Sequence, residues 1–317
     1  MNQEKKPLVI LSGPTAVGKS SLSIELAKQI NGAIISADSM QVYRYMDIGS
    51  AKITSEEMQG VPHYLVDFLM PDEEFHVVKF QEYAKQALKK IYADGQIPIV
   101  VGGTGFYIQA LLYDIDFTAE EEDGVYRARL EEEAKKYGNT YLHERLRQVD
   151  KESADAIHPN NVKRVIRALE FYEKTGNKIS EHNENERKKE SPYRFAYFVL
   201  DDDRAKIYEQ IDRRVDKMCE MGLIEEVKRL KKMGFTKDMV SMQGLGYKEI
   251  LDYLDGNLTL EQAIYILKRD TRHFAKRQLT WFRREREVQW IEKEDFGYDE
   301  KKILSYMQEQ LRERGIV

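Results

Sequence analysis

The chain has 317 residues, which is long for one compact domain and suits a core with a second, smaller unit. Hydrophobic residues make up 42% of it and charged residues 33%, so the composition predicts a globular chain with a heavily ionised surface. The net charge of −5 excludes a protein that attracts polyanions over its whole surface, and the single cysteine, Cys219, excludes an internal disulfide and a cysteine-based zinc cluster.

Residues 1–7 are mostly polar and lead directly into a short apolar run at 8–11. A run this short predicts neither a signal peptide nor a membrane span. A lone cysteine also suits a reducing compartment. We therefore expect a cytoplasmic protein with no membrane partner, and a monomer is the default expectation for its assembly.

A glycine-rich loop separates the first predicted strand, residues 7–13, from the first predicted helix, residues 22–30. The loop matches G-x-x-x-x-G-K-[ST] in full. Its residues are Gly13, Pro14, Thr15, Ala16, Val17, Gly18, Lys19 and Ser20. In such a P-loop, backbone N–H groups and the helix N-terminus hold a phosphate, the lysine neutralises it, and the serine hydroxyl can ligate Mg²⁺. The pattern leaves open whether the phosphate chain belongs to a nucleoside triphosphate or to another magnesium diphosphate.

Further short apolar runs predict strands at residues 32–38, 63–67, 98–103 and 195–200, of which 63–67 is the weakest. Because these runs are apolar on both faces, they are typical of a parallel sheet covered by helices. After residue 200 the pattern predicts helices to the end of the chain.

The segment between the fourth and fifth strands is charge-dense and has helical periodicity at residues 121–137 and 162–175. It ends in the polar tract 181–190, which fits either a hinge or disordered stretch or a solvated helix end. We interpret residues 114–191 as an all-helical insertion domain. The remaining residues, 1–113 and 192–317, are expected to form an α/β core with a P-loop NTPase-like parallel sheet flanked by helices, followed by C-terminal helices.

The carboxyl ends of parallel strands share one edge of the sheet, where ligands bind. Asp38 follows the second strand, and Gly102, Gly103 and Thr104 follow the fourth. A carboxylate there can serve as a general base or as a ligand near the metal, although a strand-end aspartate can also cap a turn. Two glycines allow the backbone to approach a ligand closely, and the threonine adds a hydroxyl.

Helical geometry separates two neighbouring arginines, Arg213 and Arg214. The apolar stripe of Ile207, Ile211 and Val215 has Arg214 at its edge, whereas Arg213 points well away from it. An arginine that faces inward needs an anionic partner, so Arg214 is expected to hold either a phosphate or a protein carboxylate. Arg213 is expected to be a solvated surface charge.

Two further helices carry basic residues opposite their apolar positions. In the basic segment 268–286, one helical face carries Arg269, Arg272, Lys276 and Arg283. In the insertion, Arg164 and Arg167 lie opposite the apolar positions of their helix. Solvated helix faces often look like this, but faces this uniform in sign favour contact with a nucleic-acid backbone.

Taken together, motifs along nearly the whole chain resemble the tRNA dimethylallyltransferases, also called tRNA isopentenyltransferases. They are, in order, Gly13-Pro-Thr-Ala-Val-Gly-Lys-Ser20, Asp38-Ser-Met-Gln-Val-Tyr43, Gly60-Val-Pro-His-Tyr-Leu65, Gly102-Gly-Thr-Gly-Phe-Tyr107, Ile157-His-Pro-Asn160 with Lys163-Arg-Val-Ile-Arg-Ala-Leu169, Ile211-Asp-Arg-Arg214, Gln243-Gly-Leu-Gly-Tyr-Lys248 and Lys276-Arg-Gln-Leu-Thr-Trp-Phe-Arg283.

The resemblance implies transfer of a dimethylallyl group from dimethylallyl diphosphate to N6 of adenosine 37, beside the tRNA anticodon, with Mg²⁺ as cofactor. Asp38 would take the proton from N6 and help to fix the base, and Thr104 would position the amine. Lys19, Ser20 with its Mg²⁺, and Arg214 would stabilise the departing diphosphate.

The resemblance also implies a surface for the anticodon stem-loop of tRNA, of which Arg127 is the loosest member. Its residues would be Asp38, Ser39, Met40, Gln41, Thr104, Arg127, Lys163, Arg164, Val165, Ile166, Arg167, Gln243, Gly244, Gly246, Tyr247, Lys248, Lys276, Arg277, Gln278 and Arg283. Phe106 stands where the family often has leucine, and the sequence has no cysteine-rich tail, so the bacterial type is the nearer comparison.

Three alternatives remain open at this stage. An ATP-dependent small-molecule kinase would share the P-loop but would not need basic helical faces. An enzyme that prenylates free adenine nucleotides would need neither the insertion nor the basic segment 276–283. A nucleotide-dependent RNA-binding switch would use the P-loop only for regulation.

Overall fold

The computed structural model describes residues 5–117 and 124–317. Residues 1–4 of the predicted polar start and residues 121–123 of the predicted helix 121–137 lie outside the described residues. The chain divides into two compact units, a core unit of Met1–Leu112 with Pro192–Val317 and a helical unit of Tyr113–Ser191. The predicted insertion, residues 114–191, falls within the helical unit.

The core unit contains a six-stranded sheet in the order β3-β2-β4-β1-β5-β6, and every pair of neighbouring strands is parallel. The predicted fold class is therefore confirmed. The strands are β1 (Lys6–Ser12), β2 (Gly32–Ser36), β3 (His63–Tyr64), β4 (Ile97–Gly102), β5 (Tyr193–Asp201) and β6 (Val288–Glu292).

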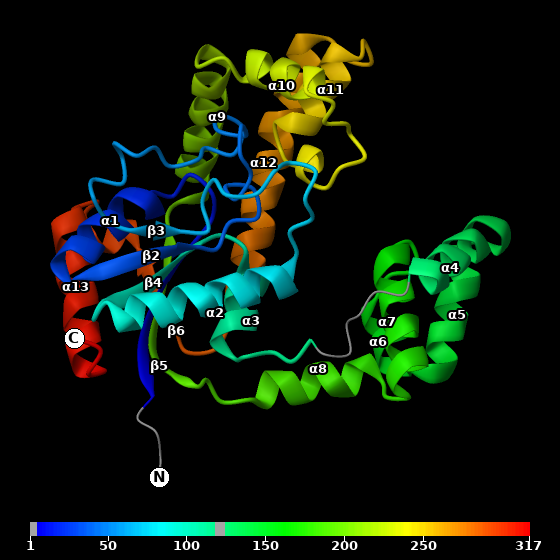
Figure 1. The fold of residues 1–317 in the computed structure, drawn as a ribbon, viewed down its shortest axis with the longest axis horizontal. Coiled ribbons are helices and arrows are strands. Elements are labelled where there is room, and N and C mark those ends of the chain that lie inside the picture. Colours follow the sequence, from blue (N-terminus) through cyan, green and yellow to red (C-terminus); the bar gives the residue numbers. More distant parts are fainter. Residues whose placement is uncertain (1–4, 118–123) are drawn as a thin grey trace. The chain divides into compact units, whose positions relative to one another are not determined.

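Eight helices of the described core unit accompany this sheet, with two short 3₁₀ turns, η2 (Ser241–Gln243) and η3 (Lys293–Phe296). They are α1 (Lys19–Gln29), α2 (Val77–Ala93), α3 (Gly105–Leu112), α9 (Arg204–Glu220), α10 (Leu223–Lys232), α11 (Tyr247–Leu254), α12 (Leu260–Phe282) and α13 (Glu300–Glu313). Figure 1 shows α2 and α3 in cyan, and α1 in blue beside α13 in red.

Alternate residues of β1 explain how the sheet is covered. Val9 and Leu11 pack into one apolar core with residues of α1 and α13, such as Leu26 and Met307. The residues between them in β1 point to the opposite face, because side chains alternate along a strand. There α2 packs against β2 and β4. Burial on both faces is why the strands read as continuous apolar runs.

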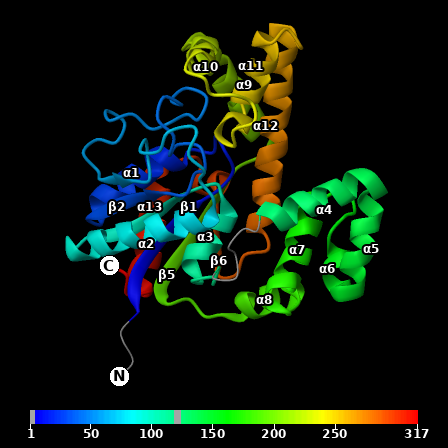
Figure 2. The ribbon, with the colours of Figure 1, turned by 45° about the vertical axis from the view of Figure 1, so that its right-hand side comes forward.

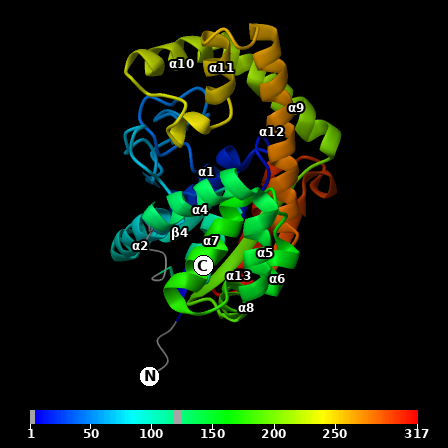
Figure 3. The same ribbon diagram turned by 90° about the vertical axis from the view of Figure 1, so that its right-hand side faces the viewer.

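The helices α9 and α12 lie side by side, and α10 and α11 pack near one end of this pair (Figure 3). Capping side chains define where both long helices begin. Asp203 accepts hydrogen bonds from the amides of Ala205 and Lys206 at the start of α9, and Thr259 caps α12 together with Gln262.

The described residues of the helical unit, 113–117 and 124–191, include five helices, which surround an apolar core of their own (Figure 2, green). They are α4 (Gly124–Tyr137), α5 (Asn139–Val149), α6 (Lys151–Ala156), α7 (Val162–Thr175) and α8 (Ile179–Lys188). The predicted helix at 162–175 coincides with α7, which ends at Gly176 in the left-handed conformation. The polar tract 181–190 is mostly part of α8, so of the two alternatives the solvated helix is the correct one.

The prediction of helices from residue 200 to the end of the chain is wrong at β6, which pairs in parallel with β5. This strand lies at the edge of the sheet, and Ile291 is its only buried residue. A half-exposed edge strand lacks the continuous apolar run that identifies the central strands.

The position of β6 generates a stability prediction. Replacing Ile291 with alanine should lower the free energy of unfolding by about 2–5 kcal/mol, because the side chain belongs to the core that α1 and α13 share with the sheet. Both tryptophans, Trp281 and Trp290, belong to the core unit, so denaturant unfolding followed by tryptophan fluorescence reports on it. The exposed neighbour Glu292 provides the control, since Glu292→Ala should change the same free energy by less than about 0.5 kcal/mol. Equal effects of the two substitutions would contradict the assignment of β6 to the core.

Candidate active site

A cavity of about 410 Å³ lies at the carboxyl edge of the sheet in the core unit. The P-loop, the residues after β2 and β4, and the facing sides of α9 and α12 contribute to its lining. Lys19, Asp38, Gly103 and Arg214 are among the residues that line it. The fold therefore brings together the lysine, the strand-end carboxylate and the inward arginine that the sequence identified separately.

Lys19 lies at the start of α1, and its Nζ donates hydrogen bonds to the carbonyls of Gly13 at 3.0 Å and Pro14 at 2.7 Å. The pKa of Lys19 is lowered to about 7, mainly because the side chain is removed from solvent; the nearby charge of Arg214 acts in the same direction and that of Asp38 opposes it. The ammonium is thus held ready at the P-loop, and an anion in the cavity would favour its charged form.

Asp38 follows β2 and has its carboxylate turned back on its own backbone. Its Oδ1 accepts hydrogen bonds from the amides of Met40 at 2.8 Å and Gln41 at 3.3 Å. These bonds orient the side chain as a turn cap does, while Asp38 also lines the cavity. The other oxygen, Oδ2, is therefore the one suited to accept a proton or a hydrogen bond from a ligand.

The loop after β4 packs closely against the end of β2. A Cβ atom at Gly102 would lie 2.3 Å from the carbonyl oxygen of Ala37, so only glycine permits this approach. The amide of Thr104 donates to the same carbonyl at 3.3 Å. The structure consequently holds Asp38 and Thr104 on adjoining loops, as predicted from the strand ends.

Arg214 and Arg213 have the orientations that the helical stripe predicts. Nη1 of Arg214 donates to the hydroxyl of Thr15 in the P-loop at 3.4 Å, and Arg214 lines the cavity. Removal from solvent lowers the pKa of Arg214, while the charges of Asp38 and Glu57 raise it. The side chain of Arg213 is 74% exposed and pairs with Glu209 at 2.6 Å.

Gln278 requires a correction, because we expected it at a surface for tRNA and its side chain is buried. Its Oε1 accepts from the amide of Thr15 at 2.8 Å, and its Nε2 donates to the carbonyl of Gly103 at 3.0 Å. It therefore ties the P-loop to the loop after β4. The signal was present in the sequence, since Gln278 lies three residues after the buried Ala275 and four before the buried Phe282.

The basic face of α12 is partly neutralised. Arg272 pairs with Asp212 of α9, and Arg269 pairs with its neighbour Asp270. Lys276, Arg277 and Arg283, in contrast, are exposed and remain available as a cationic surface.

The segment 243–248 is placed next to the loop that follows Asp38. A Cβ atom at Gly244 would lie 2.4 Å from Cε of Met40. Gln243 is exposed, whereas the side chain of Tyr247 is fully buried and bonds to Glu226. The expectation that Tyr247 contacts tRNA directly is therefore wrong, because its side chain lies inside the core unit.

Within the helical unit, the predicted residues also divide by exposure. Lys163 and Arg164 are exposed on α7. Val165 and Ile166 are buried in the core of this unit, so the expectation that their side chains face tRNA is wrong. The reason is helical geometry, because these two residues lie on the apolar side of the same turn.

Arg127 and Arg167 both form ion pairs with Glu170, whose side chain is 1% exposed. The shortest distances are 2.8 Å for Arg127 and 3.7 Å for Arg167. A buried carboxylate requires such partners, so both arginines have a structural role that the sequence did not reveal.

The sequence also missed Lys293, which follows β6. Its Nζ donates to the carbonyl of Val17 in the P-loop at 3.4 Å and lies 3.9 Å from the carboxylate of Asp202. Finding it from sequence would have required the prediction of β6, the strand that brings it to the P-loop.

Comparisons with known proteins find similar chains that match most of this sequence. The family model described as IPP transferase matches residues 41–285. A tRNA dimethylallyltransferase of Lachnoclostridium phytofermentans is 61% identical over 312 residues, which cover 98% of this chain and 99% of the relative.

Two solved structures are also similar. One is the full-length tRNA isopentenylpyrophosphate transferase of Bacillus halodurans, with 46% identity, a TM-score of 0.74 and 98% coverage of both chains. The other is a eukaryotic dimethylallyltransferase acting on tRNA, with 32% identity and a TM-score of 0.78, over 90% of this chain and 74% of that one.

The lowered pKa of Lys19 generates a prediction for anion binding. Near pH 8, diphosphate should bind with uptake of a proton at Lys19, because the anion raises a pKa that starts at about 7. Below about pH 6, Lys19 is already charged and this uptake should vanish. Calorimetric titration with inorganic diphosphate in buffers of different ionisation enthalpy measures the number of protons.

Lys19→Arg provides the comparison, since an arginine stays charged at every pH used and should take up no proton of its own. Lys28→Arg, an exposed position on the same helix, should behave like the wild type. Equal proton uptake near pH 8 by Lys19→Arg and the wild type would rule out this role of Lys19.

Proposed function

This chain belongs to the IPP transferase family and is a transferase, and we propose that it transfers a dimethylallyl group from dimethylallyl diphosphate to N6 of adenosine 37 in tRNA. Prenyl transfer to tRNA follows from two close relatives, both named tRNA dimethylallyltransferase. Each of them matches this chain along nearly its whole length. The observation that carries the finer proposal is the convergence of Lys19, Arg214 and Asp38 on one cavity.

The diphosphate is the leaving group of this reaction. Its departure requires positive charge that is already in place, because reorienting solvent during the reaction costs free energy. The P-loop amides, Lys19 and Arg214 supply that charge from a site partly removed from water, where electrostatic interactions are stronger. Arg214 is further oriented by its hydrogen bond to Thr15.

Mg²⁺ fits this arrangement as a cofactor. Ser20 is among the residues that line the cavity, at the start of α1, and a hydroxyl oxygen is the kind of ligand that Mg²⁺ prefers. Among residues 5–117 and 124–317, no cluster of three or more His, Cys, Asp or Glu side chains could hold a metal by itself. This suits an ion that arrives with the diphosphate and keeps several waters. When bound, it would neutralise charge on the leaving group.

The acceptor amine needs a base. The N6 lone pair of adenine is delocalised into the ring, so the amine is a poor nucleophile. As the bond between N6 and C1 of the dimethylallyl group forms, the bond from C1 to the diphosphate oxygen breaks, and a proton leaves N6. We assign the proton to Oδ2 of Asp38, since Oδ1 accepts two backbone hydrogen bonds. Thr104, on the adjoining loop, would position the amine.

The substrate base must leave the stack of the anticodon loop to reach this cavity. The exposed Lys276, Arg277 and Arg283 near the end of α12 would hold tRNA phosphates on the core unit. Lys163 and Arg164 would do the same on the helical unit.

None of the helices within the described ranges has the length and apolar character of a membrane span. The proposal includes action as a monomer in the cytoplasm.

The decisive experiment supplies purified protein with Mg²⁺, labelled dimethylallyl diphosphate and an anticodon stem-loop that carries an unmodified adenosine 37. Label should appear on this adenosine and not on free AMP. A stem-loop with guanosine at position 37 serves as the matched control. Label on AMP alone would favour the enzyme that acts on free nucleotides, and turnover of ATP without prenyl transfer would favour the kinase.

The assignment of the base predicts the behaviour of Asp38→Asn. The amide oxygen of asparagine can still accept hydrogen bonds from the amides of Met40 and Gln41, but the side chain cannot take a proton. The turnover number should therefore fall by about 10² or more. Stem-loop affinity should stay within about twofold. Asp94→Asn, at an exposed position after α2, is the control and should leave turnover unchanged. A full turnover number in Asp38→Asn would exclude the carboxylate as the base.

The neighbouring arginines form a second matched pair. Arg214→Ala should reduce kcat/KM for dimethylallyl diphosphate by about 10²–10³, because it removes a preorganised cation from the cavity. Arg213→Ala removes the same charge from the outer face of α9 and should have an effect below about twofold. Steady-state kinetics with both substrates varied distinguishes them. Similar losses in both variants would point to helix stability in place of leaving-group stabilisation.

A further inference from the structure

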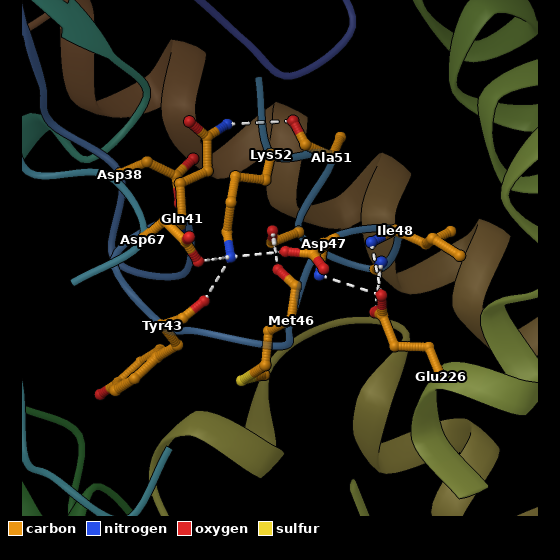
Figure 4. A network of polar contacts seen from close by, with 12 residues as sticks. Asp38, Gln41, Tyr43, Met46, Asp47, Ile48, Ala51, Lys52, Asp67 and Glu226 are labelled. Atoms are coloured by element: carbon orange, nitrogen blue, oxygen red, sulfur yellow. Dashed lines mark hydrogen bonds and ion pairs between the residues drawn. The ribbon is translucent and has the colours of Figure 1, made fainter. Parts of the chain in front are cut away.

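A buried carboxylate that is not among the residues lining the cavity holds the loop that follows Asp38. Glu226 lies on α10, and it is 1% exposed. Its Oε2 accepts hydrogen bonds from the amides of Asp47 at 3.0 Å and Ile48 at 2.8 Å, and its Oε1 accepts from the amide of Gly49 at 3.1 Å (Figure 4). Burying a charge is unfavourable unless donors surround it, and three consecutive backbone amides do so here.

Tyr247 of α11 completes this arrangement. Its hydroxyl donates to Oε1 of Glu226 at 2.9 Å and accepts from the amide of Ser50 at 3.1 Å. Two side chains therefore engage four consecutive amides, 47–50. The contact is tight, because a Cβ atom at Gly49 would lie 2.6 Å from Cζ of Tyr247.

The same loop is braced from a second direction. Nζ of Lys52 donates to the carbonyl of Tyr43 and to the carboxylates of Asp47 at 2.7 Å and Asp67 at 2.6 Å (Figure 4). Residues 44–53 contain no helix or strand, so the backbone has no regular hydrogen-bond ladder of its own. Besides a few turn hydrogen bonds, such as that from the amide of Lys52 to the carbonyl of Asp47 at 2.9 Å, these side chains hold the segment in shape.

This segment forms a wall of the cavity. Ser50 and Ile53 line it together with the P-loop and Asp38. Ser50 is the direct link, since its amide bonds to Tyr247 while the residue faces the cavity. A loop that had to be ordered when a ligand binds would lower affinity, whereas a loop already held in place avoids that cost.

We propose that Glu226 and Tyr247 are positioning residues that hold segment 44–53 as a preformed wall for the allylic diphosphate. They act through Ser50 and Ile53 and do not touch the reacting atoms. The inference rests on the proposed function for the identity of the ligand. The family resemblance implied that Tyr247 contacts tRNA. The proposal instead gives this residue a role in binding dimethylallyl diphosphate.

The test compares Tyr247→Phe and Glu226→Gln with two controls at exposed positions, Tyr265→Phe on α12 and Glu225→Gln on α10. Both test variants should bind dimethylallyl diphosphate about tenfold more weakly by calorimetry, and KM for it should rise by about the same factor, because each leaves buried donors unpaired. The turnover number at saturation and the affinity for the anticodon stem-loop should stay within about twofold. Both controls should match the wild type.

Amide hydrogen exchange supplies a readout that is independent of activity. Exchange at residues 47–50 should accelerate by about tenfold or more in both test variants, while the P-loop amides remain as in the wild type. If Glu226→Gln lowers the melting temperature strongly, Tyr247→Phe alone decides, since it keeps the ring and the three amide bonds of Glu226.

Unchanged exchange at 47–50, or unchanged affinity for dimethylallyl diphosphate, in Tyr247→Phe would overturn the proposal. Weakened stem-loop binding with normal binding of dimethylallyl diphosphate would also overturn it, in favour of a direct role in tRNA binding. Failure of the wild type to prenylate the stem-loop would count against the proposed function instead, because calorimetry and exchange do not require turnover.

Discussion

Two cations, Lys19 and Arg214, face one carboxylate, Asp38, in a cavity partly removed from water. Each cation lowers the free energy of an anion bound between them, and removal from solvent already lowers the pKa of both. Such a site is stabilised when a polyanion enters. An excess of positive charge in the cavity requires the P-loop, α9 and the end of β2 to lie together at one edge of the sheet. The rest of the core unit holds them in this arrangement.

Backbone groups and buried side chains maintain it. Gln278 links the P-loop to the loop after β4, and the glycine at 102 lets that loop reach the end of β2. Glu226 and Tyr247 hold segment 44–53, which also lines the cavity, through the amides 47–50. Each of these groups is fixed by hydrogen bonds before any ligand arrives, so binding does not have to order the site.

The division of labour among basic residues depends on exposure. Lys276 and Arg277 remain exposed on α12, whereas Arg272 on the same helix is occupied by Asp212. On α7, Lys163 and Arg164 are exposed, but Arg167 turns toward the buried Glu170. A count of positive residues in a segment therefore overstates the charge available to an RNA backbone, because protein carboxylates already neutralise part of it.

The sequence by itself determined the central strands, the P-loop, the orientation of Arg214 against Arg213, and the presence of Asp38 and Thr104 at one edge. Each of these follows from local periodicity or from the geometry of parallel strands, which needs no knowledge of distant contacts. Only the tertiary structure decided the edge strand β6 with Lys293, the burial of Tyr247, the hydrogen-bond partners of Gln278, and the pairing of Arg127 with Glu170. The reason is that these features depend on partners between 21 and 276 residues away along the chain, which no local pattern encodes.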